Sequence, residues 1–177
     1  MSVKTRALVL DFGGVISRTL FETHAMTEQA LGLAPGSLTW QGPFDPASDP
    51  LWVAMQNNEL TEREYWQQRT LEVSELAGER WEEMSQFIIA ARGADPALII
   101  RPEALDAMAK AQAGGARLAI LSNELDLFYG AGFRDKLPFM RQFEVVIDAT
   151  YTKIMKPDPR AYYSCAEALG LACEDCI

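Results

Sequence analysis

The sequence predicts an α/β fold in which a doubly wound parallel sheet carries an inserted α-helical domain. Three observations predict it. The short apolar runs are continuous rather than alternating, which is typical of strands buried on both faces. Segments with helical spacing separate these runs. The interval between the first two runs is far longer than one crossover connection needs. The apolar runs cover residues 7–10, 118–121 and 145–147.

Each apolar run is followed by a polar residue. Asp11 follows the first run, Ser122 and Asn123 follow the second, and Asp148 follows the third. In open parallel sheets the ligand binds outside the carboxyl ends of the strands. We therefore expect Asp11 and Ser122 to lie together at one edge of the sheet.

Helices are predicted between and after the strands. A helix over residues 102–113 has proline in its first turn and stops at two glycines, and a second runs from the N-cap Asp158 to residue 169. The insertion is predicted to hold helices over 18–31, 50–58, from the capping box of Thr61 and Glu64 past Trp66, and 79–92. Its core is expected to contain Trp40, Trp52, Trp66 and Trp81. The predicted domains are a core of residues 1–17 and 95–177 and an insertion of residues 18–94.

Composition excludes several classes of partner. The 177-residue chain has a net charge of −9, whereas nucleic acids and anionic membranes require a basic surface. No apolar stretch approaches the roughly 18 residues that a membrane-spanning helix needs. The three cysteines do not form a disulfide framework. We therefore expect a cytoplasmic protein with no nucleic-acid or membrane partner.

The first strand leads into a candidate reactive site. Asp11 is followed by Phe12, Gly13 and Gly14, and the glycines allow the main chain to approach a ligand closely. A carboxylate there can act as a nucleophile or bind a hard cation. The alternative is that Asp11 only caps a following helix.

Two further segments complete the site. Ser122 and Asn123 bring a hydroxyl and an amide to the same edge, and Lys156 follows the third strand in a loop stiffened by Pro157 and Pro159. An ammonium beside a helix N-terminus suits a phosphate. Carboxylate, hydroxyl and lysine in this order indicate phosphoryl transfer through an aspartyl phosphate.

These segments resemble the first three sequence motifs of the haloacid dehalogenase superfamily of hydrolases. The first is Leu10–Ile16, the second is Leu121–Asn123, and the third is Lys156–Pro159 with Tyr162. The resemblance implies a Rossmann-like core, with the insertion as the superfamily's helical cap. It also implies a magnesium-dependent phosphatase that acts on a small phosphorylated metabolite.

The resemblance assigns a role to each matching residue. Asp11 would be the nucleophile, and its carboxylate and the main-chain carbonyl of Gly13 would bind Mg²⁺. Ser122 and Lys156 would hold the transferring phosphoryl group. The full set of phosphate-binding residues that we expect is Gly14, Ser122, Asn123 and Lys156.

The sequence departs from the superfamily pattern at Gly13. Members usually carry a second aspartate there, which protonates the leaving oxygen, and glycine has no side chain to do so. A general acid contributes about 10²- to 10⁴-fold to a rate. His24 and Glu124 are replacements suggested by position only, and a structural role is the alternative for each.

The superfamily's fourth motif is a further strand that ends in paired acidic residues and supplies another magnesium ligand. It is expected just past Ile177, and the pair Glu174 and Asp175 precedes it. One alternative is therefore a truncated or non-catalytic domain of this fold, or one completed by another chain. Another is a dehalogenase, which uses the same aspartate without a metal, although those members carry a bulky residue in place of Gly13.

Overall fold

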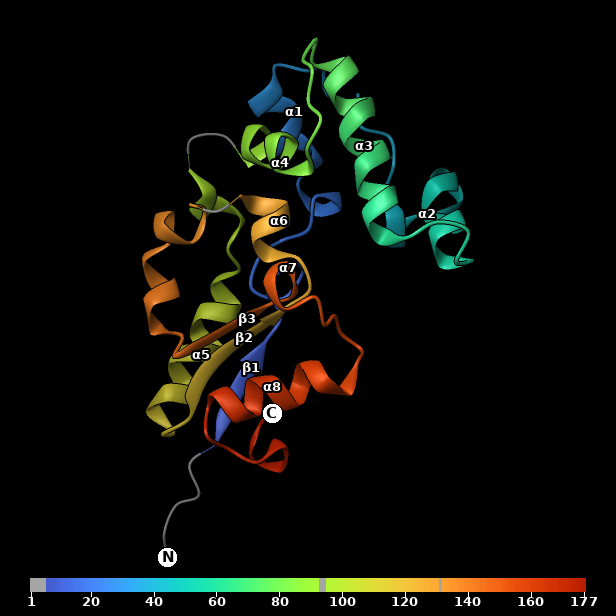
Figure 1. The fold of residues 1–177 in the computed structure, drawn as a ribbon. Coiled ribbons are helices and arrows are strands. Elements are labelled where there is room, and N and C mark those ends of the chain that lie inside the picture. The colour runs from blue at the N-terminus through green and yellow to red at the C-terminus, as the bar shows by residue number, and fades with distance from the viewer. Residues whose placement is uncertain (1–5, 93–94, 131) are drawn as a thin grey trace, which may run out of the picture. The chain divides into compact units, whose positions relative to one another are not determined.

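The computed structural model describes residues 6–92, 95–130 and 132–177 (Figure 1). The described residues form two compact units. Unit 1 comprises residues 6–18, 96–127 and 132–177, and unit 2 comprises residues 19–92, 95 and 128–130. The predicted domains also include residues 1–5, 93–94 and 131, which lie outside the described residues.

Unit 1 is a mixed α/β unit built on a parallel sheet. Within the described residues the strand order is β1-β2-β3, with Leu10 opposite Ile120 and Ser122 opposite Asp148. The elements are β1 (Ala7–Leu10), α5 (Pro102–Ala113), β2 (Arg117–Ser122), β3 (Val145–Asp148), α7 (Ala149–Thr152) and α8 (Pro159–Ala168). Helix α6 (Leu125–Tyr129) begins in unit 1 and ends in unit 2.

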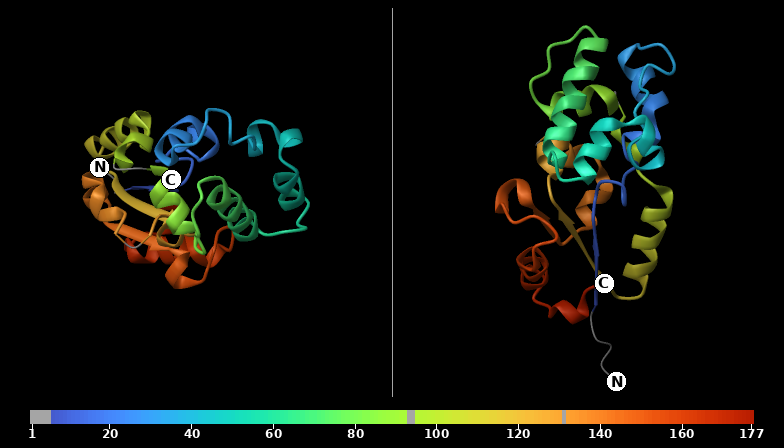
Figure 2. Two further views of the ribbon diagram at one scale, coloured as in Figure 1. Left: turned by 90° about the horizontal axis from the view of Figure 1, so that it is seen from above. Right: turned by 90° about the vertical axis from the view of Figure 1, so that its right-hand side faces the viewer.

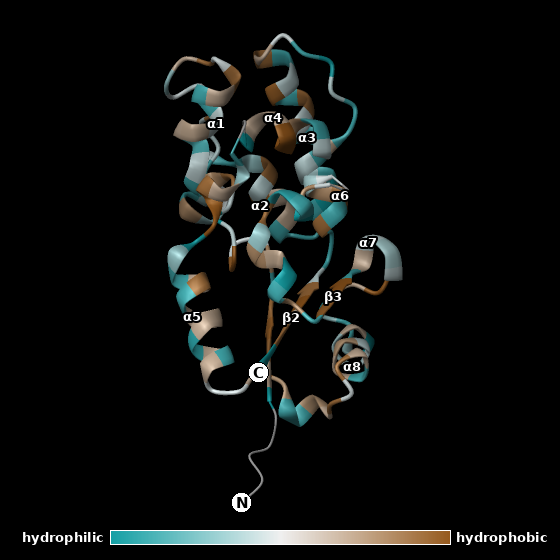
Figure 3. Cartoon of the chain, turned by 90° about the vertical axis from the view of Figure 1, so that its left-hand side faces the viewer, coloured by the Kyte–Doolittle hydropathy of each residue, from teal (hydrophilic) through white to brown (hydrophobic). Residues whose placement is uncertain are grey.

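Helices cover both faces of the sheet, as the continuous apolar runs predicted. Helices α5 and α8 lie on opposite faces (Figure 2), and strands β2 and β3 are hydrophobic along their length (Figure 3). Neighbouring residues of a strand point to opposite faces of the sheet. Between the sheet and α8, a cluster of buried residues is formed by Ala7, Ala119, Leu121, Ala161, Cys165 and Leu169.

The ends of the unit 1 helices follow local sequence signals. Helix α5 has the predicted bounds, with Pro102 in its first turn and Gly114 as its C-cap. Helix α8 begins after Asp158, whose Oδ1 accepts a hydrogen bond of 2.9 Å from Arg160 N. This cap confirms the prediction for the segment that follows Lys156.

Unit 2 is helical in its described residues. Its elements are α1 (His24–Leu31), α2 (Pro50–Gln56), α3 (Glu62–Leu76) and α4 (Met84–Arg92). The predicted capping box is present, because Thr61 N donates to Glu64 Oε2 at 2.7 Å and Glu64 N to Thr61 Oγ1 at 3.2 Å. Trp40 and Trp66 are buried and pack around Phe21, with ring centroids 5.5 and 5.3 Å from it.

Two predicted helix starts in unit 2 are wrong. The helix predicted from residue 18 begins at His24, because Thr23 has a non-helical backbone conformation after a short 3₁₀ turn. The helix predicted from residue 79 begins at Met84. The main-chain amides of Glu82 and Glu83 donate to the side chain of Gln86, each at 2.9 Å, instead of entering a helical ladder.

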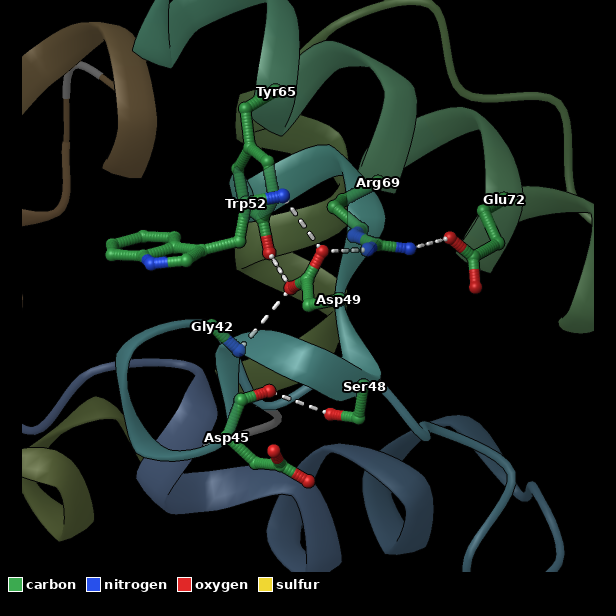
Figure 4. A network of polar contacts seen from close by, with 8 residues as sticks. All are labelled: Gly42, Asp45, Ser48, Asp49, Trp52, Tyr65, Arg69 and Glu72. Carbon is green, nitrogen blue, oxygen red and sulfur yellow. Dashed lines mark hydrogen bonds and ion pairs between the residues drawn. The ribbon is translucent and has the colours of Figure 1, made fainter. Parts of the chain in front are cut away.

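Unit 2 also contains a buried polar network (Figure 4). Asp49 is fully buried, and its carboxylate accepts from Tyr65 Oη at 2.7 Å, Trp52 N at 2.9 Å and Arg69 at 2.5 Å. Arg69 also pairs with Glu72. A buried charge is tolerated only when it is paired and hydrogen-bonded, so this network ties the segment before α2 to α3.

None of the helices in the described ranges combines the length and the apolar character needed to cross a bilayer.

Candidate active site

The carboxyl end of β1 presents Asp11 on a tight turn. Asp11 Oδ1 accepts a hydrogen bond of 2.7 Å from Phe12 N. The carbonyl of Phe12 accepts from Ile16 N at 3.0 Å and from Ser17 N at 2.9 Å, which closes the turn. Asp11 does not cap a helix, since the next helical turn in the described chain begins at Phe21.

Buried side chains on either side of the turn hold its position. Phe12 and Ile16 are fully buried, and the ring of Phe12 packs edge-to-face on Phe133 with centroids 5.7 Å apart. Gly14 has a φ of 78°, a conformation that favours glycine. The Asp11 side chain keeps 39% of its surface exposed, so a substrate can reach it.

Gly13 does not need to be glycine for steric reasons. A Cβ at this position meets no heavy atom within 4 Å, and its φ lies outside the left-handed region. The missing carboxylate at residue 13 is therefore a chemical difference from the superfamily pattern rather than a requirement of the turn.

Lys156 meets Asp11 directly. Lys156 Nζ lies 2.9 Å from Asp11 Oδ2, and the lysine side chain is 20% exposed. The loop that carries Lys156 runs between α7 and α8, and the Lys156–Pro157 peptide bond is cis. The structure thus joins the first and third predicted motifs through an ion pair.

Asn123 also meets Lys156, but at the main chain. Asn123 Oδ1 accepts a hydrogen bond of 2.6 Å from Lys156 N, and Asn123 Nδ2 donates to Lys156 O at 3.2 Å. We expected the Asn123 side chain to bind phosphate, but both of its polar atoms are hydrogen-bonded to the main chain of Lys156.

Ser122 is the last residue of β2 and is buried. The parallel register places the carboxyl ends of β1 and β2 at the same edge of the sheet, with Leu10 opposite Ile120. Ser122 and Asp11 therefore both lie at that edge, as predicted.

Asp148 has a structural role that the sequence did not reveal. Its carboxylate accepts hydrogen bonds from Asp126 N at 2.8 Å, Leu125 N at 3.2 Å and Thr150 N at 2.8 Å. It thereby caps α7 and holds the segment that follows Ser122 and Asn123. Its position at a strand end was the only sequence signal.

The two replacement acids suggested by position have different surroundings. His24 lies in unit 2, where its ring packs edge-to-face on Trp40 with centroids 4.3 Å apart. Burial lowers the pKa of His24 and favours its neutral form. Glu124 lies in unit 1 directly after Asn123.

Few side chains are available to hold a metal. Within residues 6–92, 95–130 and 132–177, no group of three or more His, Cys, Asp or Glu side chains is arranged around one position. The carboxylate of Asp148 is taken up by main-chain amides. Asp11 and Gly13, the two residues that we expected to bind a metal, lie together in the turn after β1.

Comparisons with known proteins identify relatives along nearly the whole chain. Residues 5–177 match the family model of haloacid dehalogenase-like hydrolases. The mouse protein acyl-CoA dehydrogenase family member 10 is 25% identical over 173 residues. That alignment covers 97% of this chain but 16% of the mouse protein, so the chain spans about a sixth of this relative's length.

Solved structures share the fold. An L-2-haloacid dehalogenase from Xanthobacter autotrophicus has a TM-score of 0.53 at 19% identity, over 95% of this chain and 66% of its own. A phosphatase of the same superfamily from Thermococcus onnurineus has a TM-score of 0.52 at 16% identity, over 97% and 75%. A superfamily hydrolase from Geobacter sulfurreducens has a TM-score of 0.55 at 14% identity, over 99% and 77%.

Proposed function

The chain belongs to the haloacid dehalogenase-like hydrolases, and on this premise we propose that it is a magnesium-dependent phosphatase of a small phosphorylated metabolite. The observation that carries the proposal is the ion pair of 2.9 Å between Lys156 Nζ and Asp11 Oδ2 at the carboxyl edge of a parallel sheet. This pair combines a nucleophile with a cation that suits a phosphoryl group.

The reaction has two steps. An Asp11 carboxylate oxygen attacks phosphorus, an O–P bond forms to Asp11, and the bond from phosphorus to the ester oxygen breaks. Because residue 13 carries no acid, the leaving oxygen takes its proton from solvent water and departs as an alcohol. Water then attacks the same phosphorus, which releases inorganic phosphate and regenerates Asp11.

Lys156 and Ser122 act on the phosphoryl group. The Lys156 ammonium balances negative charge on the phosphoryl oxygens and reduces their repulsion of the Asp11 carboxylate. Ser122 donates its hydroxyl hydrogen, and the Gly14 amide lies on the turn that faces the same group. Because Lys156 is already beside Asp11, little reorganisation is needed when the substrate binds.

The residues fit magnesium in the type of donor they offer. Magnesium prefers oxygen ligands, takes one or two carboxylates and keeps several waters or substrate phosphate oxygens. Asp11 and the Gly13 carbonyl would hold the ion. When bound, the ion neutralises charge on the phosphoryl group.

Unit 2 is the proposed cap domain, and its helices supply substrate specificity. The free thiols of Cys165, Cys173 and Cys176 support a reducing, cytoplasmic setting. The net charge of −9 supports a small-molecule substrate rather than a nucleic acid.

The test is phosphate release from a panel of phosphorylated sugars, nucleotides and p-nitrophenyl phosphate. We expect turnover that chelation by EDTA abolishes and added Mg²⁺ restores. Turnover that EDTA leaves intact would refute the metal dependence. No turnover by the wild type, with every substrate and with Mg²⁺ present, would instead favour a non-catalytic binding domain.

Dehalogenation of a haloacid is the second candidate. The missing acid at residue 13 favours it, whereas the small size of Gly13 counts against it, because dehalogenases of this superfamily carry a bulky residue there. A halide leaves as an anion and needs no proton, so the missing acid at residue 13 does not lower the rate of that reaction. Halide release from 2-chloropropionate in the presence of EDTA would support this function. Phosphate release without halide release would exclude it.

A further inference from the structure

Lysine is a flexible cation, so its position depends on how its main chain is held. The ammonium of Lys156 stands at the end of a four-carbon stem with several rotatable bonds. Its contact with Asp11 needs the main chain of residue 156 to lie at a defined distance from β1. In a loop, that distance is set by whatever bonds the main chain.

Asn123 supplies two such bonds. Its Oδ1 accepts from Lys156 N at 2.6 Å and its Nδ2 donates to Lys156 O at 3.2 Å. Both main-chain groups of the same residue are bound by one rigid, planar amide. This arrangement fixes the position and the orientation of residue 156 relative to the end of β2.

Asn123 is itself held in place. Asp148 binds the main-chain amides of Leu125 and Asp126 at 3.2 and 2.8 Å. Thr150 Oγ1 accepts from Leu127 N at 3.3 Å. The segment after β2 is therefore anchored to β3 and α7. Asn123 lies in this anchored segment, and its side chain holds the loop that carries Lys156.

We propose that Asn123 is a positioning residue that sets the Lys156 ammonium against Asp11, rather than a direct ligand of the phosphoryl group. The inference rests on the proposed function, in which Lys156 stabilises the transferring group. Asn123 then affects catalysis through Lys156, because its side chain holds the main chain of that lysine.

A double-mutant cycle distinguishes positioning from direct binding. Asn123→Ala is expected to lower kcat for p-nitrophenyl phosphate on the order of 10²-fold, because a displacement of about 1 Å in a catalytic group has that effect. In a Lys156→Ala background the same substitution is expected to lower kcat by less than about 2-fold. An equal loss in both backgrounds would mean that Asn123 contacts the substrate itself, and it would overturn the proposal.

A spectroscopic measurement tests the positioning without any turnover. The lysines are reductively methylated with ¹³C-formaldehyde, and the Lys156 signal is assigned by its absence in Lys156→Arg. Asp11→Asn, which removes the charge of the carboxylate, gives the signal position without the ion pair. We expect Asn123→Ala to move the Lys156 signal toward that position.

Asn57→Ala is the matched control. Asn57 is exposed, and its Nδ2 donates to Glu59 Oε1 at 3.2 Å. It is expected to leave the Lys156 signal and kcat unchanged. If Asn123→Ala does not fold, as judged by circular dichroism, Asn123→Ser replaces it, since a serine is too short to reach both main-chain groups.

The outcomes separate this inference from the proposed function. A Lys156 signal that stays at its wild-type position in Asn123→Ala and Asn123→Ser refutes the positioning role, whatever the activity. If the wild type hydrolyses no phosphate ester, the proposed function fails, and a moved Lys156 signal still upholds the structural part of the inference.

Discussion

Lys156 Nζ lies 2.9 Å from Asp11 Oδ2 and joins the loop between α7 and α8 to the end of β1. Phe12 N binds the other carboxylate oxygen of Asp11 at 2.7 Å. The carboxylate is thus oriented by a charge on one side and a main-chain amide on the other. This arrangement makes the contribution of each partner measurable.

Asp11→Asn is expected to reduce phosphate release to background, because the amide cannot form the aspartyl phosphate. Phosphate release by equally pure preparations of both proteins provides the measurement, and circular dichroism shows that the variant is folded. Unchanged hydrolysis would assign the activity to a contaminant.

Lys156→Ala is expected to lower kcat about 10²- to 10³-fold, with a smaller effect on KM. The reason is that charge accumulates on the phosphoryl oxygens in the transition state more than in the bound substrate. Steady-state kinetics with p-nitrophenyl phosphate separates the two constants. A change confined to KM would show that Lys156 contributes only to substrate binding. Lys153→Ala is the control, since Lys153 is exposed in the same loop and its Nζ donates to the main-chain carbonyl of Thr150.

Gly13→Asp is expected to raise turnover, and more for poor leaving groups than for good ones. The turn has space for a Cβ at residue 13, which meets nothing within 4 Å. A general acid contributes about 10²- to 10⁴-fold where the leaving oxygen needs a proton. The measurement compares alkyl phosphates with p-nitrophenyl phosphate. Equal effects on both would contradict the view that residue 13 marks a missing acid. Gly13→Asn, which adds similar volume without an acid, is the control.

Asp49→Ala is expected to destabilise the protein by about 3–5 kcal/mol, because it removes the buried carboxylate partner of Arg69 and leaves only the partly exposed Glu72 to pair with this buried charge. Arg69 is 6% exposed. Urea unfolding followed by tryptophan fluorescence measures the loss. Asp45→Ala is the matched control, since Asp45 lies nearby and is exposed (Figure 4), and its effect is expected within about 0.5 kcal/mol. Equal effects of the two substitutions would show that the buried network contributes no stability.

The contribution of Asp49 should also depend on pH. Burial by itself raises the pKa of Asp49, but hydrogen bonds from Tyr65 and Trp52 and the charge of Arg69 outweigh it and lower the pKa below its ordinary value of 3.8. A carboxyl group whose pKa is lowered by folding stabilises the protein above its ordinary pKa, and this stabilisation is lost as pH falls through the folded-state pKa. The difference in unfolding free energy between wild type and Asp49→Asn should therefore be largest well above pH 3.8 and should shrink as the pH falls below that value. A difference that stays constant or grows over this range would contradict the lowered pKa.

Several elements could be predicted because their signals are local. The apolar runs located all the described strands of unit 1 to within one residue at each end. The bounds of α5 and the capping box of α3 followed from a few neighbouring residues. The two helices that were predicted to start too early begin instead at His24 and Met84. Thr19 and Glu22 bond each other before the first, and Gln86 Oε1 accepts from the amides of Glu82 and Glu83 before the second. Periodicity does not encode these hydrogen bonds.

The sequence by itself determined the order of strands and helices, and it determined that Asp11, Ser122 and Lys156 follow strands in an order typical of one superfamily. These properties depend on hydrophobic periodicity and on residues a few positions apart. Only the tertiary structure decided that Asn123 binds the main chain of Lys156 and that Asp148 binds the amides after β2. Such partners are distant in the chain, and the register of the sheet and the packing of the loops bring them together.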